Sequence, residues 1–176
     1  MERTFANRVL MVRPASFGAN AETAASNVFQ STDASPDALF AARGESVELE
    51  RGLRDAGVDV LVFDEERDAR EGAVSPDACF PNNWFTTHAS GRLVLYPMES
   101  PSRRREIRSE LVDLVMDAVD VREVLDLRHW AERGRFLEGT GSLVLDREAK
   151  VAFAALSSRT CEGPLAEWCD AMGTER

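Results

Sequence analysis

The stretch DACFPNNWFTTHASGRLVLYPM at residues 77–98 decides the local fold, because it contains two strand-like runs with a turn between them. Residues 78–88 and 92–98 contain aromatic and β-branched side chains, which favour strands. Ser90 and Gly91 between the two runs are typical of a tight turn. The stretch therefore predicts a β-hairpin.

A helix and a third strand are predicted after this hairpin. Ser100 and Pro101 are typical of a helix start. Apolar residues then recur at helical spacing on one face, while arginine and glutamate cover the other face: Ile107, Leu111, Leu114, Val115 and Ala118. Residues 121–127, VREVLDL, read as a strand and complete a ββαβ unit.

Parts of the same unit recur on both sides of it. Earlier in the chain, a strand from Arg8, a helical region at 35–56 and a strand at 58–63 follow one another. Later, residues 137–156 predict a second hairpin and residues 163–172 a short amphipathic helix. The two flanking segments therefore look like further copies of the unit.

The repeat has a period of about 60 residues, which is typical of a fold built from similar modules. We expect three modules, at approximately 7–64, 76–127 and 136–176. The third module lacks its last strand, so we expect a single partial domain that is truncated at its C-terminus.

Composition excludes several classes of function. The chain has 176 residues and a formal net charge of -10, which argues against nucleic-acid and anionic-membrane partners. No run approaches the roughly 20 apolar residues of a membrane helix, so we expect a cytoplasmic protein. The three cysteines form no closely spaced metal-binding pair, and we expect neither a metal nor a cofactor: Cys79, Cys161 and Cys169.

Six short motifs, in order along the chain, resemble the pentein superfamily of guanidino-group-modifying enzymes. They are VRPASFGAN from Val12, NVFQ from Asn27, DACFPNNW from Asp77, LYPMESPSRRRE from Leu95, LEGTGSLVLD from Leu137 and ALSSRT from Ala155. The similarity is to the amidinotransferase and arginine deiminase-related branch, which includes citrulline-utilisation hydrolases. The resemblance implies an α+β propeller of ββαβ modules, of which this chain holds about two and three-quarter of five blades.

The resemblance also implies an activity. We expect the N-terminal part of a hydrolase that acts on the ureido or guanidino carbon of citrulline or an arginine derivative, through a covalent cysteine intermediate. In the family, the catalytic histidine and the nucleophilic cysteine lie at positions beyond Arg176, so we expect the chain alone to be inactive. The expected partner is a small amino-acid substrate, and a homo-oligomer is possible.

Other activities remain open at this point. Arginine deimination, dimethylarginine hydrolysis and amidino transfer use the same family and differ in substrate. A non-catalytic remnant or an amino-acid-binding module is an alternative of another class. His88 and His129 do not match the family's catalytic histidine, so we interpret both as structural or surface residues.

Glu138 matches the acidic position that partners the catalytic histidine in related enzymes. Gly139 and Gly141 beside it would let backbone segments approach closely. The alternative is an exposed carboxylate in a glycine turn.

Asp77, Asn82 and Asn83 match a substrate-binding aspartate and an acidic pair of the dimethylarginine hydrolases, with the pair changed to amides here. A carboxylate only accepts hydrogen bonds and suits a cation, whereas an asparagine also donates and suits a neutral ureido group. The change therefore favours citrulline over arginine. The alternative for Pro81, Asn82 and Asn83 is a simple turn, although Phe80 and Trp84 favour a strand.

Arg103 and Arg159 match arginines that hold the substrate's α-carboxylate in the dimethylarginine hydrolases. Arginine suits this task because its planar guanidinium can bind a carboxylate through two hydrogen bonds. Arg104 could replace Arg103, and most arginines in a chain of this composition are solvated surface groups.

Overall fold

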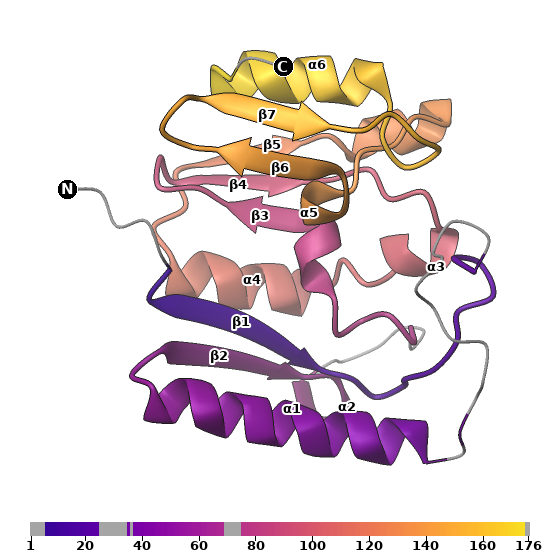
Figure 1. Ribbon diagram of the computed structural model, residues 1–176, viewed down its shortest axis with the longest axis vertical. Helices are drawn as coiled ribbons and strands as arrows, with labels where there is room; N and C mark the ends of the chain where they lie inside the picture. Colours follow the sequence, from indigo (N-terminus) through magenta and orange to yellow (C-terminus); the bar gives the residue numbers. More distant parts are fainter. Residues whose placement is uncertain (1–5, 25–34, 36, 69–74, 175–176) are drawn as a thin grey trace. The chain divides into compact units, whose positions relative to one another are not determined.

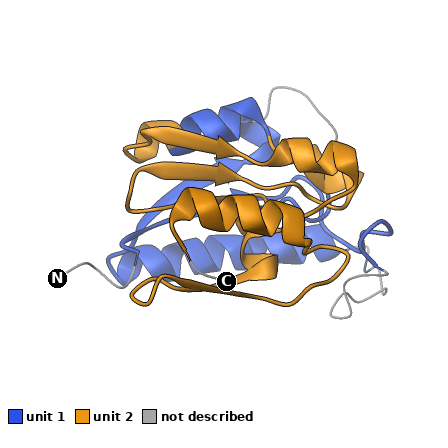
Figure 2. Cartoon of the chain, turned by 90° about the horizontal axis from the view of Figure 1, so that it is seen from above, with its two compact units in different colours: residues 1–81, 108–115 blue, residues 82–107, 116–176 orange. Residues whose placement is uncertain are grey.

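The computed structural model describes residues 6–24, 35, 37–68 and 75–174 (Figure 1). These residues divide into two compact units, coloured separately in Figure 2. Unit 1 comprises residues 1–81 and 108–115, and unit 2 comprises residues 82–107 and 116–176. The NVFQ motif at 27–30 lies outside the described residues.

Unit 1 contains two parallel strands connected through a helix. β1 (Arg8–Arg13) pairs with β2 (Asp59–Asp64), and α1 (Ala38–Asp55) lies between them in the sequence. Gly57 has a φ of 82°, the left-handed conformation that commonly ends a helix. A short helix, α2 (Glu65–Asp68), follows β2.

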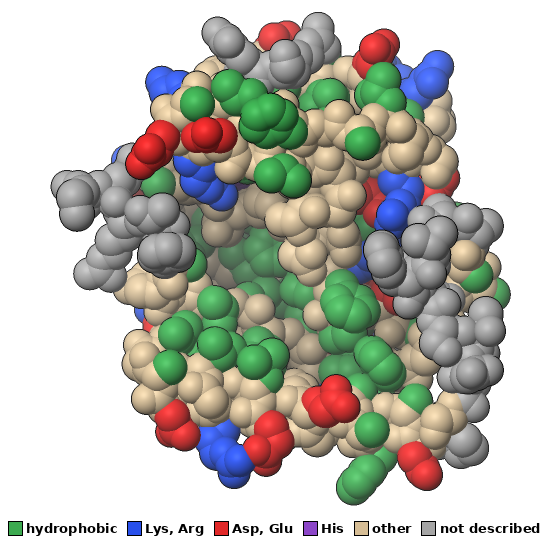
Figure 3. All heavy atoms as spheres, viewed as in Figure 1, with side chains coloured by type: hydrophobic (Ala, Val, Ile, Leu, Met, Phe, Trp, Pro, Cys, Tyr) green, Lys and Arg blue, Asp and Glu red, His purple; other side chains and the backbone are tan. Residues whose placement is uncertain are grey.

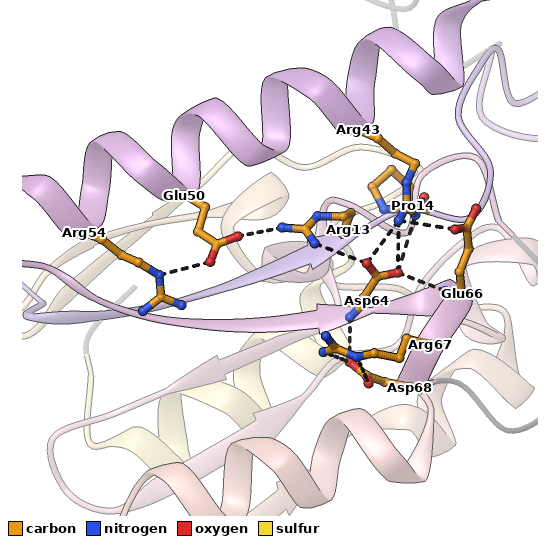
Figure 4. Close-up of polar contacts among 9 residues, drawn as sticks. All are labelled: Arg13, Pro14, Arg43, Glu50, Arg54, Asp64, Glu66, Arg67 and Asp68. Atoms are coloured by element: carbon orange, nitrogen blue, oxygen red, sulfur yellow. Dashed lines mark hydrogen bonds and ion pairs between the residues drawn. The ribbon is translucent and has the colours of Figure 1, made fainter.

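Charged side chains link α1 to the two strands. The helix has no fully buried residue of its own. Arg13 on β1 donates to Glu50 of α1 at 2.6 Å and to Asp64 of β2 at 3.2 Å, and Arg43 donates to Asp64 at 3.0 Å (Figure 4). Burial alone would raise the pKa of Asp64, but the hydrogen bonds and charge of Arg43 and Arg13 hold it below its usual value.

Unit 2 contains a three-stranded sheet and a separate hairpin. β3 (Phe85–Thr87) pairs antiparallel with β4 (Arg92–Leu95), which pairs parallel with β5 (Glu123–Asp126). β6 (Leu143–Asp146) and β7 (Val151–Ala154) form the second hairpin. These pairings confirm both predicted hairpins and the mixed α and β composition, while the number of blades stays a prediction.

Among the described residues, five further helical segments follow β4. They are α3 (Pro101–Arg104), α4 (Ser109–Ala118), α5 (Gly139–Ser142), α6 (Glu162–Met172) and a 3-10 helix at Arg128–Arg133. The α4 helix begins in unit 1 and ends in unit 2. In the part of the chain that the structure describes, no helix has the length and apolar character to cross a bilayer.

The core of unit 2 lies between its strands and α6. Its buried side chains come from β4, β6, β7, α6 and the segments beside them: Val94, Tyr96, Leu127, Leu137, Leu143, Ala152, Leu165, Trp168 and Cys169. Inside this core, the Trp168 Nε1–H donates to the Tyr96 hydroxyl at 3.0 Å, and that hydroxyl lies 2.8 Å from Thr86 Oγ1. Burial raises the pKa of Tyr96 to about 12.

Apolar and charged side chains both reach the surface. On the face drawn in Figure 3, basic and acidic side chains lie interspersed and apolar side chains lie among them. In unit 2, the paired residues Val144 and Phe153 are 69% and 61% exposed, so the outer face of the β6–β7 hairpin is apolar.

Three predicted elements are shorter or different in the structure. The strand expected at 78–88 is reduced to β3, because Pro81–Asn83 form a 3-10 helix instead. Proline fixes φ and lacks an N–H, so it favours this turn over a strand. The strand expected at 137–146 begins only at Leu143, after the helical turn α5.

The helix expected after Pro101 is broken into α3 and α4, and three of the charged side chains in this segment are buried. Arg103, Glu106 and Arg108 are each no more than 9% exposed. Buried charges require partners, and Arg103 pairs with Glu106 while Arg108 pairs with Glu65.

Candidate functional site

Glu138 is the most deeply buried carboxylate of the candidate site. It is 2% exposed, it directly precedes α5, and its backbone N–H donates to Ser142 Oγ at 2.9 Å. Its Oε1 accepts the Glu99 amide at 3.0 Å, and its Oε2 accepts from Arg159 Nη1 at 3.4 Å. The alternative of an exposed carboxylate in a glycine turn is therefore wrong.

Burial and the neighbouring donors act in opposite directions on the pKa of Glu138, and burial has the larger effect. Burial raises the pKa of Glu138, whereas the Glu99 amide and the charges of Arg159 and Arg103 act in the opposite direction. A buried carboxylate with fixed donors can hold and orient a positively charged or N–H-bearing group at low reorganisation cost. These are the properties required of a carboxylate that orients a histidine or a substrate nitrogen.

The two glycines beside Glu138 allow a close approach of the 82–83 turn, as predicted. Gly139 has a φ of 38°, and a Cβ there would lie 2.6 Å from the Asn82 carbonyl oxygen. A Cβ on Gly141 would lie 2.5 Å from Asn83 Nδ2. Asn82 Nδ2 also donates to Thr140 Oγ1 at 2.6 Å. Both asparagines therefore contact the turn that carries Glu138.

Arg103 is only 6% exposed and has partners on two sides. Its Nε and Nη2 donate to the Glu106 carboxylate at 3.0 to 3.2 Å, and its Nη1 donates to Asn83 Oδ1 at 3.0 Å. The predicted carboxylate-binding arginine thus lies beside a predicted substrate-binding amide. Its contact with a substrate stays a prediction.

Arg159 lies beside Glu138 but is more accessible, with a side chain that is 29% exposed. Ser142 Oγ donates to the Arg159 carbonyl at 2.9 Å and accepts from Thr160 Oγ1 at 2.8 Å. Ser142 therefore joins the backbones of Glu138 and Arg159. Sequence reasoning missed Ser142 and Thr160, although both lie inside the motifs that contain the predicted site residues.

Arg104, the alternative to Arg103, is bound to the backbone of its own unit. Its Nε donates to the Met98 carbonyl and its Nη2 to the Glu99 carbonyl, both at 2.8 Å, and its guanidinium lies over the Phe136 ring. These bonds fix the segment whose Glu99 amide donates to Glu138. Arg104 thus supports the site through the backbone.

Asp77 belongs to unit 1, where its Oδ2 accepts from Asn20 Nδ2 at 2.7 Å and from Thr23 Oγ1 at 3.4 Å. Asn20 is part of the VRPASFGAN motif, so the structure brings two of the six motifs together at this point. The predicted place of Asp77 beside Asn82 and Asn83 stays a prediction.

The histidines and cysteines lie elsewhere. His88 is half-buried, its Nε2 is 2.9 Å from Thr86 Oγ1, and burial lowers its pKa to about 4. His129 is exposed, and Cys169 is a core residue. Within the described ranges, neither histidine bonds to Glu138, and no cluster of His, Cys, Asp and Glu could hold a metal ion.

Comparison with known proteins gives a family and a fold. The family model described as "N,N dimethylarginine dimethylhydrolase, eukaryotic" matches residues 13–176. The comparison with curated protein sequences found no match.

Several solved structures share the fold. The substrate-bound N-terminal domain of ArgZ, an arginine dihydrolase from Cyanobacteria, has a TM-score of 0.66 at 17% identity, covering 96% of this chain and 55% of its own. A dimethylarginine dimethylaminohydrolase adduct with S-methyl-L-thiocitrulline has a TM-score of 0.66 at 14% identity. The match covers 97% of this chain and 59% of that enzyme's chain.

The enzyme from Pseudomonas aeruginosa in complex with citrulline has a TM-score of 0.62 at 15% identity, covering 96% of this chain and 58% of its own. The chain thus spans 55% to 59% of the length of these three structures.

Proposed function

The chain belongs to the N,N-dimethylarginine dimethylhydrolase family, and from this premise we propose that it supplies the substrate-orienting residues of a C–N hydrolase. The substrate class is citrulline or another arginine derivative, attacked at its ureido or guanidino carbon. The family membership and the shared fold support the reaction class. The contacts among Glu138, Asn83, Arg103 and Arg159 support the residue roles.

The reaction that the resemblance implies has two steps. A cysteine thiolate bonds to the planar carbon, a C–N bond breaks, and the departing nitrogen takes a proton from a histidine. Water then releases the carbamoyl or amidino group from sulfur. We assign Glu138 to the orientation of that histidine or of a substrate N–H, since it is a buried acceptor with fixed bonds on both oxygens.

The balance of charges within unit 2 favours a substrate with a neutral ureido group over one with a cationic guanidinium. Glu138 faces Arg159 and Glu106 faces Arg103, so each carboxylate of the cluster has a cationic partner. The amide of Asn83 adds no charge. A buried guanidinium would need an additional negative charge here, whereas a ureido group would not.

The single observation that carries this proposal is how the two ends of the Asn83 amide are hydrogen-bonded. Its oxygen accepts from Arg103, while its Nδ2 has no hydrogen-bond partner among the residues that the structure describes. An N–H donor beside Glu138 suits the carbonyl oxygen of a ureido group.

The guanidino alternatives keep one favourable feature, the carboxylate of Asp77. If Asp77 reaches the substrate, it would suit a cationic guanidinium, as in arginine deimination or dimethylarginine hydrolysis. ArgZ is described as an arginine dihydrolase, which also concerns a guanidino substrate. An amino-acid-binding module without turnover is the alternative of another class.

Arg159 is assigned to the substrate's α-carboxylate. Its bond to Glu138 is long, at 3.4 Å, and no other side-chain bond of its guanidinium occurs among the described residues. An arginine with unused N–H groups and partial exposure can bind a carboxylate through two hydrogen bonds.

The test measures the release of ammonia from citrulline and arginine, and of dimethylamine from dimethylarginine, by the protein made from the whole reading frame. We expect the highest kcat/KM for citrulline, and we expect Arg159→Ala to raise KM by about tenfold or more through loss of a charged hydrogen bond. The control is Arg122→Ala, which removes an exposed surface arginine of the same unit. Activity unchanged by Arg159→Ala contradicts the assignment, and substrate binding without release of ammonia or dimethylamine identifies the binding module.

A further inference from the structure

Glu106 has no role in the reaction described above, yet it is 4% exposed and its side chain binds Arg103 through three N–O contacts of 3.0 to 3.2 Å. A buried carboxylate and guanidinium lose their hydration, so they persist only with good geometry and further bonds. Arg103 also donates to Asn83 Oδ1, at 3.0 Å. Hydrogen bonds therefore connect Glu106 to Asn83 through Arg103.

The hydrogen bond from Arg103 fixes which end of the Asn83 amide faces the guanidinium. A guanidinium has only N–H donors, so the amide must present its oxygen to Arg103 and its NH₂ to the other side. On that side lies Gly141, whose added Cβ would be 2.5 Å from Nδ2. The amide therefore cannot turn over without placing two donors against each other at Arg103.

We propose that Glu106 is a positioning residue that acts through Arg103 to hold the Asn83 amide with its NH₂ toward the Gly141 turn. The site then offers a hydrogen-bond donor at Asn83, and it selects ligands with an acceptor oxygen at that point. This inference rests on the proposed function for its ligand, a ureido amino acid. The orientation of Asn83 itself is independent of any ligand.

Without the Glu106 carboxylate, Arg103 has fewer constraints. Its guanidinium could rotate or leave Asn83, and the amide could then present either end. The loss should affect citrulline, which needs the donor, more than ornithine, which has no ureido oxygen. A purely structural role for Glu106 would instead lower the affinity for both compounds together.

The experiment combines nuclear magnetic resonance with calorimetry on the 176-residue chain. The side-chain NH₂ signals of Asn83 are identified by their loss in Asn83→Asp. In the wild type we expect a nuclear Overhauser effect from these protons to the Gly141 α-protons. Its absence, or an effect to the Arg103 guanidinium instead, overturns the inference whether or not a ligand binds.

Calorimetry then compares citrulline and ornithine. We expect Glu106→Ala to weaken citrulline binding about tenfold relative to ornithine, and Glu106→Gln to weaken it less, since the glutamine oxygen still accepts from Arg103. The matched control is Glu123→Gln, which removes a carboxylate paired with Arg92 on the same unit and should leave both affinities unchanged. An unchanged ratio in both Glu106 variants overturns the positioning role.

The two proposals fail in different ways. If the wild type binds no ureido amino acid, the proposed function fails, and the Overhauser effects in wild type and Glu106→Gln still decide whether Glu106 orients Asn83. If citrulline binds but the Asn83 signals are unaffected by both Glu106 variants, only the positioning role fails. The wild-type measurement stands even if Glu106→Ala does not fold.

Discussion

Gly141 leaves no room for even one additional carbon atom, because an added Cβ would lie 2.5 Å from Asn83 Nδ2. Gly139 is restricted in the same way by the Asn82 carbonyl. The two glycines therefore set how closely the asparagine turn approaches Glu138.

Gly141→Ala should displace the Asn83 amide and weaken its bond to Arg103. We expect about tenfold weaker citrulline binding and a loss of roughly 1 kcal/mol in the free energy of unfolding, measured by calorimetry and urea titration. The matched control is Gly52→Ala in α1, where an added Cβ meets nothing within 4 Å. That change should stabilise the helix by about 0.5 to 1 kcal/mol and leave binding intact. Equal effects of the two substitutions on binding contradict the account.

The β3–β4 hairpin carries a histidine whose neighbours oppose protonation. The Nε2 of His88 lies 2.9 Å from Thr86 Oγ1, and its Nδ1 lies 3.3 Å from Arg147 Nη1. Burial, with the charges of Arg147 and Arg92, lowers the pKa of His88 to about 4. The folded protein therefore binds fewer protons than the unfolded chain at pH values between about 4 and the usual histidine pKa of 6.5.

Because the unfolded chain binds more protons in this pH range, the folded protein loses stability as the pH falls. The stability that comes from neutral His88 is fully present above pH 6.5 and is lost as the pH falls toward about 4. Between pH 7 and pH 5 we expect a loss of roughly 1 to 2 kcal/mol in the free energy of unfolding, measured by urea titration. His88→Gln should remove this part of the pH dependence, whereas His129→Gln, at an exposed site, should not. Identical pH profiles for wild type and His88→Gln contradict the prediction.

Among the helices and strands, the predicted ranges were most accurate where apolar periodicity and turn residues indicated the same element. Strand β2 and helix α6 are found close to their predicted ranges, since burial and local propensity favour the same structure. The prediction was wrong at Pro81–Asn83 and at Gly139–Ser142, where short helical turns interrupt the expected strands. Periodicity reports burial along one element and gives no information on a turn that is held by contacts with a distant segment.

The candidate site also combines residues that the sequence could indicate with residues that it could not. Asp77, Glu138, Asn82, Asn83, Arg103 and Arg159 could be selected by resemblance. The structure pairs Arg103 with Asn83 and Arg159 with Glu138, joins Asn82 to Thr140 beside Glu138, and has Asp77 in unit 1. Glu106, Ser142 and Thr160 could not be selected, because their roles depend on which atoms they reach across the fold. A glutamate in an arginine-rich run reads as a surface residue until its burial is known.

For the whole molecule, the family model gives the family and the solved structures give the fold, whereas the proposed ligand rests on the individual contacts. The structural relatives are 14% to 17% identical to this chain, so their ligands do not transfer by similarity alone. The formal net charge of -10 contrasts with the paired charges around Glu138 and Arg103. The local balance, rather than the net charge, bears on the choice between a ureido and a guanidinium group.

The most direct test of this choice is a calorimetric comparison of citrulline and arginine with wild type and Asn83→Asp. The account predicts that the wild type binds citrulline more tightly than arginine. It also predicts that Asn83→Asp shifts the ratio of the two affinities toward arginine by about tenfold or more, because a donor is replaced by a charged acceptor. A wild type that prefers arginine, or a ratio that Asn83→Asp leaves unchanged, would contradict the claim that the Asn83 amide selects a ureido group.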